Sequence, residues 1–542
     1  MAGDAASVLI VGGGHNGLVA AGLLAKRGYD VTVLERRHKV GGAATTEHPW
    51  GPAYKMSALS YVVSLMPPMI LDELRLARHG YKIHPQHGYF APLDDGRALH
   101  FASDAARRRA SISQFSRADA DAHPRWERWL GELAATLGPL LSTVPPRFGS
   151  RRPSDLLDQG RLLWRLRPIG DREFADITRL FTMSIADLLD EWFESDPMRG
   201  VLSVSGVIGT WAGPRSPGTA YVMAHHQIGD LGGGQIAGAW GFPEGGMGAV
   251  SDALRAAAES FGARVRTEAD VARIDTHHGH VAGVTLGTGE SLRADIVIAT
   301  THPRITFLEH LSRDDLPEDF VTSIERWRSR SGSVKVNLAI DRLPEFRAAA
   351  GFDPEIHGGT IVLAPSLDAI EAAFQDAVSG RPATEPFADV CIPSVFDRTL
   401  APEGHHVMSM FSQWVPHGYA DAPHTSDLDA FADRLIARVE QVAPGFSDSI
   451  LHRQVIGPYE MEHTYGLVGG NIFHGELSPN QMFHMRPAPG YADFTTPIAG
   501  LYQGGSATHG GGGVTGIPAL QVVRRIERDR RRGVFAKLRR RR

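Results

Sequence analysis

The chain has 542 residues, more than one hydrophobic core usually serves, so we expect two domains. Its hydrophobic content of 42% is ordinary for a globular protein, and no apolar run approaches the roughly 18 residues that span a bilayer. The net charge of −5 argues against a nucleic-acid partner, and the single cysteine, Cys391, excludes an intrachain disulfide or a Cys-x-x-Cys redox pair.

A strand, a glycine-rich turn and a helix open the chain. The apolar run at 8–11 predicts a buried parallel strand, and the Ala- and Leu-rich segment 18–26 predicts a helix. Between them, Gly12 makes the tight turn, Gly14 lets a pyrophosphate approach the backbone, and Gly17 lets the helix pack against the sheet. Because a helix N-terminus also offers free N–H groups and a partial positive charge, this segment is predicted to bind a dinucleotide.

The end of the next strand indicates which dinucleotide binds. Residues 29–34 predict this strand, and Glu35 follows Gly17 by 18 residues, where a carboxylate can accept both ribose hydroxyls. A glutamate at this position argues against a 2′-phosphate. The second glycine pair, Gly41 and Gly42, resembles the extended FAD signature of the glutathione-reductase-like superfamily. An NAD domain does not need this pair, so the predicted cofactor is FAD.

Two later segments complete the expected flavin site. Residues 243–248 precede a predicted helix, and the short β-like runs between 269 and 299 are typical of the β-meander of FAD domains. Near the C-terminus, a glycine-rich loop at 504–516 runs into a helix with Pro518 in its first turn. The flavin N1/C2=O edge gains negative charge on reduction, so a helix N-terminus beside it favours the reduced state.

These segments together resemble the phytoene desaturase-like flavoproteins, and most closely the subgroup of the pyridine nucleotide-disulphide oxidoreductase domain-containing protein 2. The stretches that carry the resemblance are 12–46, 242–257, 465–487 and 501–518. It implies an α/β fold, namely a glutathione-reductase-like FAD-binding Rossmann fold, with bound FAD and an apolar or amphipathic substrate. In such relatives the backbone at the position of Val271 holds the adenine. The residues expected to bind FAD are Gly12, Gly14, His15, Asn16, Gly17, Glu35, Arg36, Gly41, Gly42, Ala43, Ala44, Val271, Gly505, Ser506, Gly513, Val514 and Thr515.

The expected domains are discontinuous. The FAD-binding domain takes residues 1–105, 240–305 and 490–530, and an inserted mixed α+β substrate-binding domain takes 106–240 and 305–490, followed by a basic tail at 531–542. The substrate cleft is expected between the domains, above the flavin ring. The triplet Gly232–Gly234 does not follow a strand, so we expect no built-in NAD(P) domain.

Two side chains are the catalytic candidates. Lys335 lies in the predicted strand at 333–340 and resembles the strand lysine that amine oxidases hold near flavin N5. His509 lies in the glycine-rich loop expected beside the flavin. His474 and Arg486 belong to the matching stretches, and their roles stay open between flavin, substrate and domain interface. No histidine or carboxylate pattern indicates a metal.

The expected reaction is that of a desaturase or dehydrogenase, in which hydride passes from an apolar substrate to flavin N5. Three alternatives stay open: a flavin amine oxidase-like enzyme, a redox-neutral isomerase that uses reduced flavin, and a non-catalytic FAD-binding partner protein. Oxygen and a quinone are both compatible electron acceptors.

The last 19 residues, 524–542, carry 11 basic residues against two acidic ones, a net charge of +9. A solvated tail is the simple interpretation. The sharper hypothesis is peripheral membrane contact, because each Lys or Arg near an anionic leaflet contributes about 1 kcal/mol. The N-terminus has no charged region followed by an apolar run, so we expect a cytoplasmic location.

Overall fold

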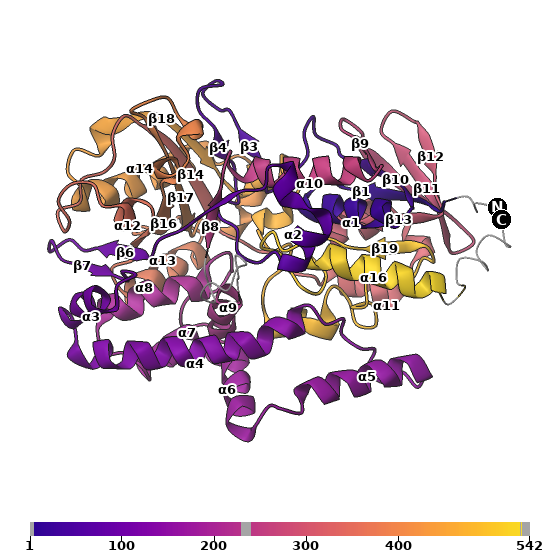
Figure 1. Ribbon diagram of the computed structural model, residues 1–542, viewed down its shortest axis with the longest axis horizontal. Coiled ribbons are helices and arrows are strands. Elements are labelled where there is room, and N and C mark those ends of the chain that lie inside the picture. Colours follow the sequence, from indigo (N-terminus) through magenta and orange to yellow (C-terminus); the bar gives the residue numbers. More distant parts are fainter. Residues whose placement is uncertain (1–4, 229–239, 532, 534–542) are drawn as a thin grey trace.

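A five-stranded parallel sheet joins strands from distant parts of the chain. The computed structural model describes residues 5–228, 240–531 and 533. The strand order is β19-β13-β1-β2-β9, and every neighbouring pair is parallel. These strands are β1 (Ser7–Val11), β2 (Asp30–Leu34), β9 (Arg264–Arg266), β13 (Ile296–Ala299) and β19 (Leu501–Gln503). The α/β flavoprotein fold predicted from the sequence is confirmed, with segments far apart in the chain side by side (Figure 1).

Both faces of this sheet are covered. Val8 and Ile10 of β1 pack into one apolar core, whereas Leu9 and Val11 pack into another. This burial on both sides explains why the strand is an uninterrupted apolar run. The first face contacts helices α1 (His15–Lys26), α10 (Met247–Ser260) and α16 (Ile517–Arg531). The second faces the antiparallel meander of β10 (Val271–His277), β11 (His280–Leu286) and β12 (Ser291–Arg293), with α11 (Glu318–Glu325) beside it.

A seven-stranded sheet forms the second unit, in the order β18-β14-β17-β16-β15-β6-β7. Its strands are β6 (Tyr89–Pro92), β7 (Ala98–His100), β14 (Ser333–Ile340), β15 (Thr360–Leu363), β16 (Phe387–Cys391), β17 (His406–Gln413) and β18 (Ile450–Ile456). The expected boundary at residue 105 placed the first two with the flavin domain. They lie instead in this sheet, because Tyr89 and Phe90 pair with Thr360 and Ile361. Phe90 is buried in the core of this unit.

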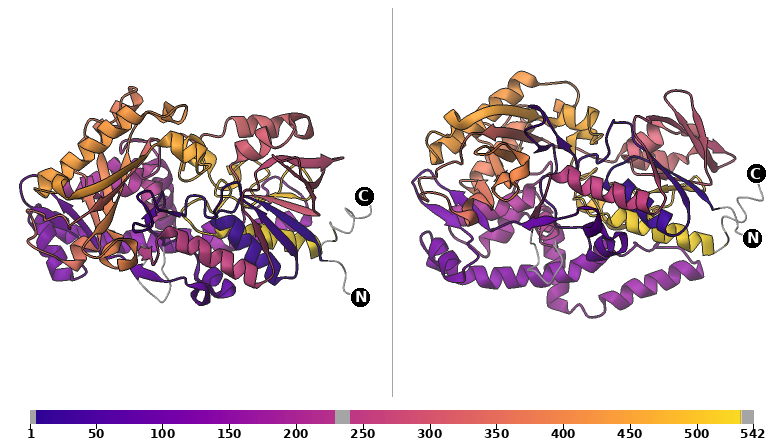
Figure 2. Two further views of the ribbon diagram at one scale, coloured as in Figure 1. Left: turned by 90° about the horizontal axis from the view of Figure 1, so that it is seen from above. Right: turned by 45° about the horizontal axis from the view of Figure 1, so that its top comes forward.

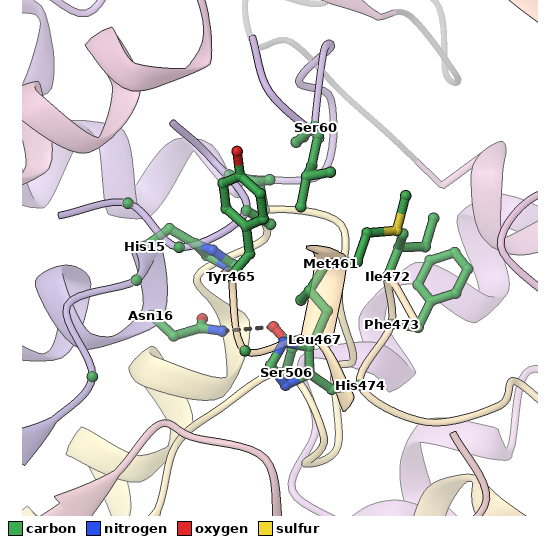
Figure 3. A pocket seen from close by; sticks show the side chains of 18 of the residues that line it. His15, Asn16, Ser60, Met461, Tyr465, Leu467, Ile472, Phe473, His474 and Ser506 are labelled. Atoms are coloured by element: carbon green, nitrogen blue, oxygen red, sulfur yellow. Dashed lines mark hydrogen bonds between the residues drawn. The ribbon is translucent and has the colours of Figure 1, made fainter. Parts of the chain in front are cut away.

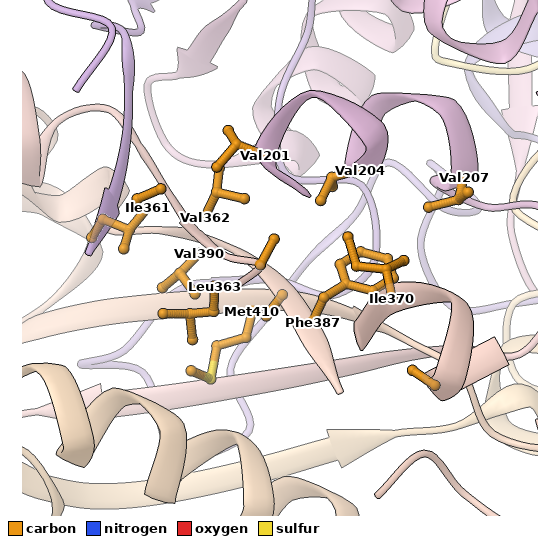
Figure 4. Close-up of a cluster of buried hydrophobic side chains, with 14 of the residues drawn as sticks. Val201, Val204, Val207, Ile361, Val362, Leu363, Ile370, Phe387, Val390 and Met410 are labelled. Atoms are coloured by element: carbon orange, nitrogen blue, oxygen red, sulfur yellow. The ribbon is translucent and has the colours of Figure 1, made fainter. Parts of the chain in front are cut away.

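The first insertion is helical, as its sequence indicates. It forms α3 (Ala105–Ser113), α4 (Arg117–Leu141), α5 (Pro153–Leu166), α6 (Asp171–Thr182), α7 (Ile185–Asp190), α8 (Asp196–Val207) and α9 (Thr219–His226). Apolar residues of α8 such as Val201 and Val204 face Val362 and Phe387 of the sheet (Figure 4). Helices α13 (Leu367–Val378) and α14 (Thr425–Val442) also bury apolar faces in this core. Figure 2 shows α4 and α5 along one edge of the molecule.

Several short elements complete the two units. They are α2 (Pro68–Leu74), α12 (Pro354–His357), α15 (Pro458–His463) and the two-stranded pairs β3 (Thr46–Glu47) with β4 (Met56–Ser57) and β5 (Ile83–Pro85) with β8 (Gly241–Pro243). None of the helices in the described parts of the chain is both long and apolar enough to cross a bilayer. The triplet Gly232–Gly234 and all of the tail at 531–542 except Arg531 and Gly533 lie outside the described residues.

Candidate flavin and substrate site

The turn between β1 and α1 explains the spacing of its glycines. Gly12 has φ +104°, a conformation that L side chains rarely adopt, and a Cβ on Gly17 would overlap the carbonyl oxygen of Gly12. A Cβ on Gly14 would meet no protein atom within 4 Å, and Gly14 borders a cavity. Gly12 and Gly17 are therefore required by the fold itself, whereas Gly14 leaves space for a ligand.

Glu35 lies at the edge of the same cavity. Its side chain is 7% exposed, and its two carboxylate oxygens accept hydrogen bonds from the backbone N–H of Gly13 at 2.8 Å and of Arg37 at 2.9 Å. The second glycine pair is adjacent, since Gly41 N donates to the Gly13 carbonyl at 2.9 Å. The two glycine segments thus form one backbone wall that ends in a fixed carboxylate.

The cavity has a volume of about 580 Å³ and continues from this wall to the seven-stranded sheet. Most of the residues expected to bind FAD line it: Gly12, Gly14, His15, Asn16, Glu35, Arg36, Gly41, Gly42, Ala43, Val271, Ser506, Gly513 and Val514. The other four, Gly17, Ala44, Gly505 and Thr515, do not. They support the wall: the Ala44 carbonyl accepts from Ser251 Oγ at 2.6 Å, and a Cβ on Gly505 would lie 2.5 Å from the Thr300 carbonyl oxygen.

The polar groups of this half suit a dinucleotide. Helix α1 begins at His15, directly at the cavity, and His15 Nε2 and Asn16 Oδ1 are buried without a hydrogen-bond partner among the described residues. A helix N-terminus offers donors to phosphates, and Glu35 offers acceptors to a ribose. The chemistry and placement of these groups fit FAD.

The C-terminal loop lies against the start of α1. Asn16 Nδ2 donates to Ser506 Oγ at 3.1 Å, and both side chains reach into the cavity (Figure 3). Gly513 has φ +100° and Val514 has φ +58°, so the chain turns sharply before α16 begins at Ile517. The loop therefore brings a second helix N-terminus close to the cavity.

Arg486 holds this loop from behind. Its guanidinium is buried and donates to the carbonyl oxygens of Phe473 at 2.8 Å, Ser506 at 3.1 Å and Thr508 at 3.1 Å. Burial lowers its pKa to about 10, so it is charged at neutral pH. The sequence left the role of Arg486 open, and in the structure its guanidinium joins these carbonyl groups behind the cavity wall.

The two histidines singled out in the sequence have different positions. His474 lines the cavity, and burial together with the charge of Arg486 lowers its pKa to about 4, so it is neutral (Figure 3). His509 does not line the cavity: its Nε2 donates to the Leu140 carbonyl at the end of α4, at 3.0 Å. This position gives no support to the catalytic role expected of His509, because its hydrogen bond directs the ring toward α4.

Lys335 reaches the cavity from β14. Its Nζ donates to Ser409 Oγ and lies 4.0 Å from the centroid of the Tyr61 ring. Burial lowers the pKa of its ammonium group from 10.5 to about 7. A lysine with this pKa can be neutral near physiological pH and can then accept a proton.

Asp389 is a cavity residue that was not expected from the sequence. In the strand pairing, Lys335 lies opposite Phe411, and Phe411 lies opposite Asp389, so the three side chains share one face of the sheet. Asp389 lines the cavity, and burial raises its pKa to about 7 although the nearby Lys335 lowers it. The only signal in the sequence was an aspartate inside the otherwise apolar run of β16, Phe387–Cys391.

The remaining wall near the sheet is mostly apolar. Its side chains include Leu59, Tyr61, Val62, Leu65, Tyr89, Ile208, Phe411, Met461, Leu467, Ile472 and Phe473. Figure 3 shows Met461, Ile472 and Phe473 on one side of the cavity and His15 and Asn16 on another. Within residues 5–228 and 240–531, no group of three or more His, Cys, Asp or Glu side chains could hold a metal ion.

Comparison with known proteins agrees with this geometry. Residues 17–517 match the family model described as flavin containing amine oxidoreductase. The chain is 39% identical to the pyridine nucleotide-disulfide oxidoreductase domain-containing protein 2 of Rattus norvegicus, over 96% of this chain and 93% of that protein. It is 24% identical to the phytoene desaturase (lycopene-forming) of Pseudescherichia vulneris, over 94% and 96%. Among solved structures, an oxidoreductase from Methanosarcina mazei has a TM-score of 0.60 at 18% identity, over 96% of this chain and 100% of that one. The resemblance predicted from the sequence is confirmed.

Proposed function

The chain belongs to the flavin containing amine oxidoreductase family, and from this premise we propose that it is an FAD-dependent dehydrogenase or desaturase of an apolar or amphipathic substrate. The observation that carries the proposal is one continuous cavity. It joins the glycine wall beside Glu35 to the sheet face that bears Lys335. A cofactor and a substrate can therefore meet in the same buried space.

The glycine wall and the two helix N-termini would hold the FAD. The N-terminus of α1 would face the pyrophosphate, Glu35 the adenosine ribose and Val271 the adenine, while the loop from Ser506 to Val514 would border the flavin. Bound FAD supplies a hydride acceptor at N5. The positive Arg486 and the N-terminus of α16 both favour negative charge on this side of the cavity.

Lys335 is proposed to receive the proton that accompanies hydride loss. When a substrate C–H bond gives up its electron pair as hydride, a neighbouring C–H, N–H or O–H bond must release a proton. The neutral amine of Lys335 would accept this proton and become an ammonium group, which the Tyr61 ring and Ser409 stabilise. An external acceptor, oxygen or a quinone, would then reoxidise the flavin.

Oxidation of an amine is the second candidate. The family description and the acidic Asp389 in the cavity wall favour it, since a carboxylate suits a cationic substrate. It uses the same hydride transfer, and the proton leaves nitrogen instead of carbon.

The test is anaerobic mixing of the FAD-loaded protein with a panel of apolar, hydroxylated and amine compounds. Bleaching of the oxidised flavin identifies the substrate class, and Lys335→Met should slow bleaching at least tenfold while FAD stays bound. If no compound bleaches the flavin although FAD is bound, the proposal fails in favour of a non-catalytic flavoprotein. Turnover only after prior reduction of the flavin indicates a redox-neutral isomerase instead.

We further propose peripheral contact with an anionic membrane, through α5 and the basic C-terminal end. Leu156, Leu157, Leu163 and Trp164 form one exposed stripe on α5, with Leu163 69% and Trp164 71% exposed. The last 19 residues of the chain carry a net charge of +9. An exposed apolar stripe and a basic segment in one protein suit the interface of an anionic bilayer.

A further inference from the structure

An unpartnered carboxyl group faces the substrate half of the cavity. Asp389 is 6% exposed and lines the cavity, and its Oδ1 has no hydrogen-bond partner among the described residues. Most buried polar atoms in folded proteins have a partner, so an exception of this kind calls for an explanation. A bound ligand that donates a hydrogen bond to Asp389 would explain it.

The nearby polar side chains do not satisfy Asp389. Lys335 donates to Ser409, and within the described part of the chain it forms no salt bridge with Asp389. Two residues along β16, Cys391 contacts Thr360 Oγ1 at 3.5 Å, and Thr360 accepts from Gln86 Nε2. These neighbours bond to one another, which leaves the carboxyl group of Asp389 directed at the cavity.

Aromatic side chains also flank Asp389. Phe411 lies directly opposite it on β17, and the Tyr61 ring stacks on Phe411 at a centroid distance of 6.2 Å. Tyr61 and Tyr89 line the same cavity as Asp389. Asp389 is therefore an ionisable acceptor beside aromatic side chains, and the neighbouring polar groups of Lys335, Thr360 and Gln86 bond to other residues.

We propose that Asp389 accepts a hydrogen bond from a hydroxyl or amine group of the substrate, so that the substrate is an amphipathic molecule with an apolar body and not a pure hydrocarbon. This inference rests on the proposed function, because it takes the cavity as the substrate site. Asp389 would then determine specificity: a substrate without a donor group leaves a buried carboxyl unpaired, and a site built in this way rejects it.

The experiment measures binding to the oxidised, FAD-loaded protein under anaerobic conditions at pH 9, where Asp389, with a pKa of about 7, is ionised and can only accept a hydrogen bond. The probes share one apolar body and differ in one group: n-octane, 1-octanol, n-octylamine and 2-octanone. Binding is read from the perturbation of the flavin absorption spectrum. We expect the alcohol, the amine or both to bind the natural chain at least tenfold more tightly than the alkane and the ketone, which have no N–H or O–H donor.

Three variants connect this preference to the carboxyl group. Asp389→Leu should remove the preference and leave alkane binding within about twofold. Asp389→Asn should keep alcohol binding and weaken amine binding, because an amide accepts a hydrogen bond but carries no charge. Cys391→Ser, on the same sheet face, is the control and should leave all four affinities unchanged.

Thermal unfolding separates a ligand-binding role from a structural one. An aspartate that holds the fold together would lower the melting temperature when replaced, whereas an unpartnered buried aspartate should leave it equal or higher in Asp389→Leu. Equal affinity for alkane and alcohol in the natural chain overturns the inference, and so does a preference that persists in Asp389→Leu. Because binding is read with oxidised flavin, these outcomes are distinct from a failure of hydride transfer, which would appear only as absent bleaching.

Discussion

Replacing Lys335 with methionine should stabilise the protein while it damages the reaction. The side chain is completely enclosed, and burial lowers the pKa of its amine from 10.5 to about 7. At about 1.4 kcal/mol per pKa unit, this difference corresponds to about 5 kcal/mol of destabilisation when the lysine is charged in the unfolded chain. Methionine has a similar length and no charge, so it should avoid this penalty and still pack against Tyr61.

One loss reduces the gain. The hydrogen bond from Lys335 to Ser409 contributes about 1 kcal/mol, whereas the attraction of Asp389 is already included in the pKa of about 7. We therefore expect a net increase of about 4 kcal/mol in the free energy of unfolding at pH 6. Ser409→Ala is the matched control, since it removes the hydrogen bond and leaves the lysine in place.

The pH dependence tests the cause. The pKa of Lys335 is lower in the folded chain than in the unfolded one, so its penalty is complete below about pH 7 and is relieved as the pH rises toward 10.5. The advantage of the methionine variant should thus fall by about 2–3 kcal/mol between pH 6 and pH 9 in urea unfolding of the FAD-loaded protein. A variant that is less stable by the same amount at both pH values would refute the reasoning, because it would show a charged lysine with a structural role.

Three further predictions concern the cofactor, the electron donor and the membrane. Gly14→Leu should abolish FAD retention, because the leucine side chain would point into the cavity. The measurement is loss of flavin absorbance with an unchanged circular dichroism spectrum. A variant that keeps its flavin absorbance would contradict the assignment of this loop. NADPH should not bleach the flavin, since the sequence shows no second dinucleotide-binding motif that follows a strand, and disulfides should not be reduced, since Cys391 is the single cysteine. Rapid bleaching at micromolar NADPH would contradict this prediction. Membrane contact should weaken in two variants, the double substitution Leu157→Glu/Trp164→Glu and a truncation after Gly533. Each should reduce sedimentation with anionic vesicles at low salt at least fivefold. Equal sedimentation of all forms would exclude membrane contact through these parts.

Local sequence determined the dinucleotide end of the site. The steric demands on Gly12 and Gly17, the space at Gly14 and the position of Glu35 depend on two strands and the turn and helix between them, which are neighbours in the chain. The dinucleotide-binding function of these residues could therefore be predicted from their spacing in the sequence, without knowledge of the tertiary structure. The apolar run at 8–11 could also be recognised, because a strand buried on both faces carries uninterrupted apolar residues. The strand at 333–340 could be recognised from the alternation of apolar residues with Ser333, Lys335 and Asn337.

Only the tertiary structure decided which distant side chains meet. Asp389 faces the cavity with Lys335 because β17 lies between their strands, and nothing in the sequence near residue 389 specifies this pairing. The same holds for His509, whose ring bonds to Leu140 of a helix about 370 residues earlier, and for β6 and β7, which join the second sheet through pairing with β15. Strand register and long-range hydrogen bonds depend on the assembled core, whereas a glycine turn depends on its own backbone and immediate neighbours.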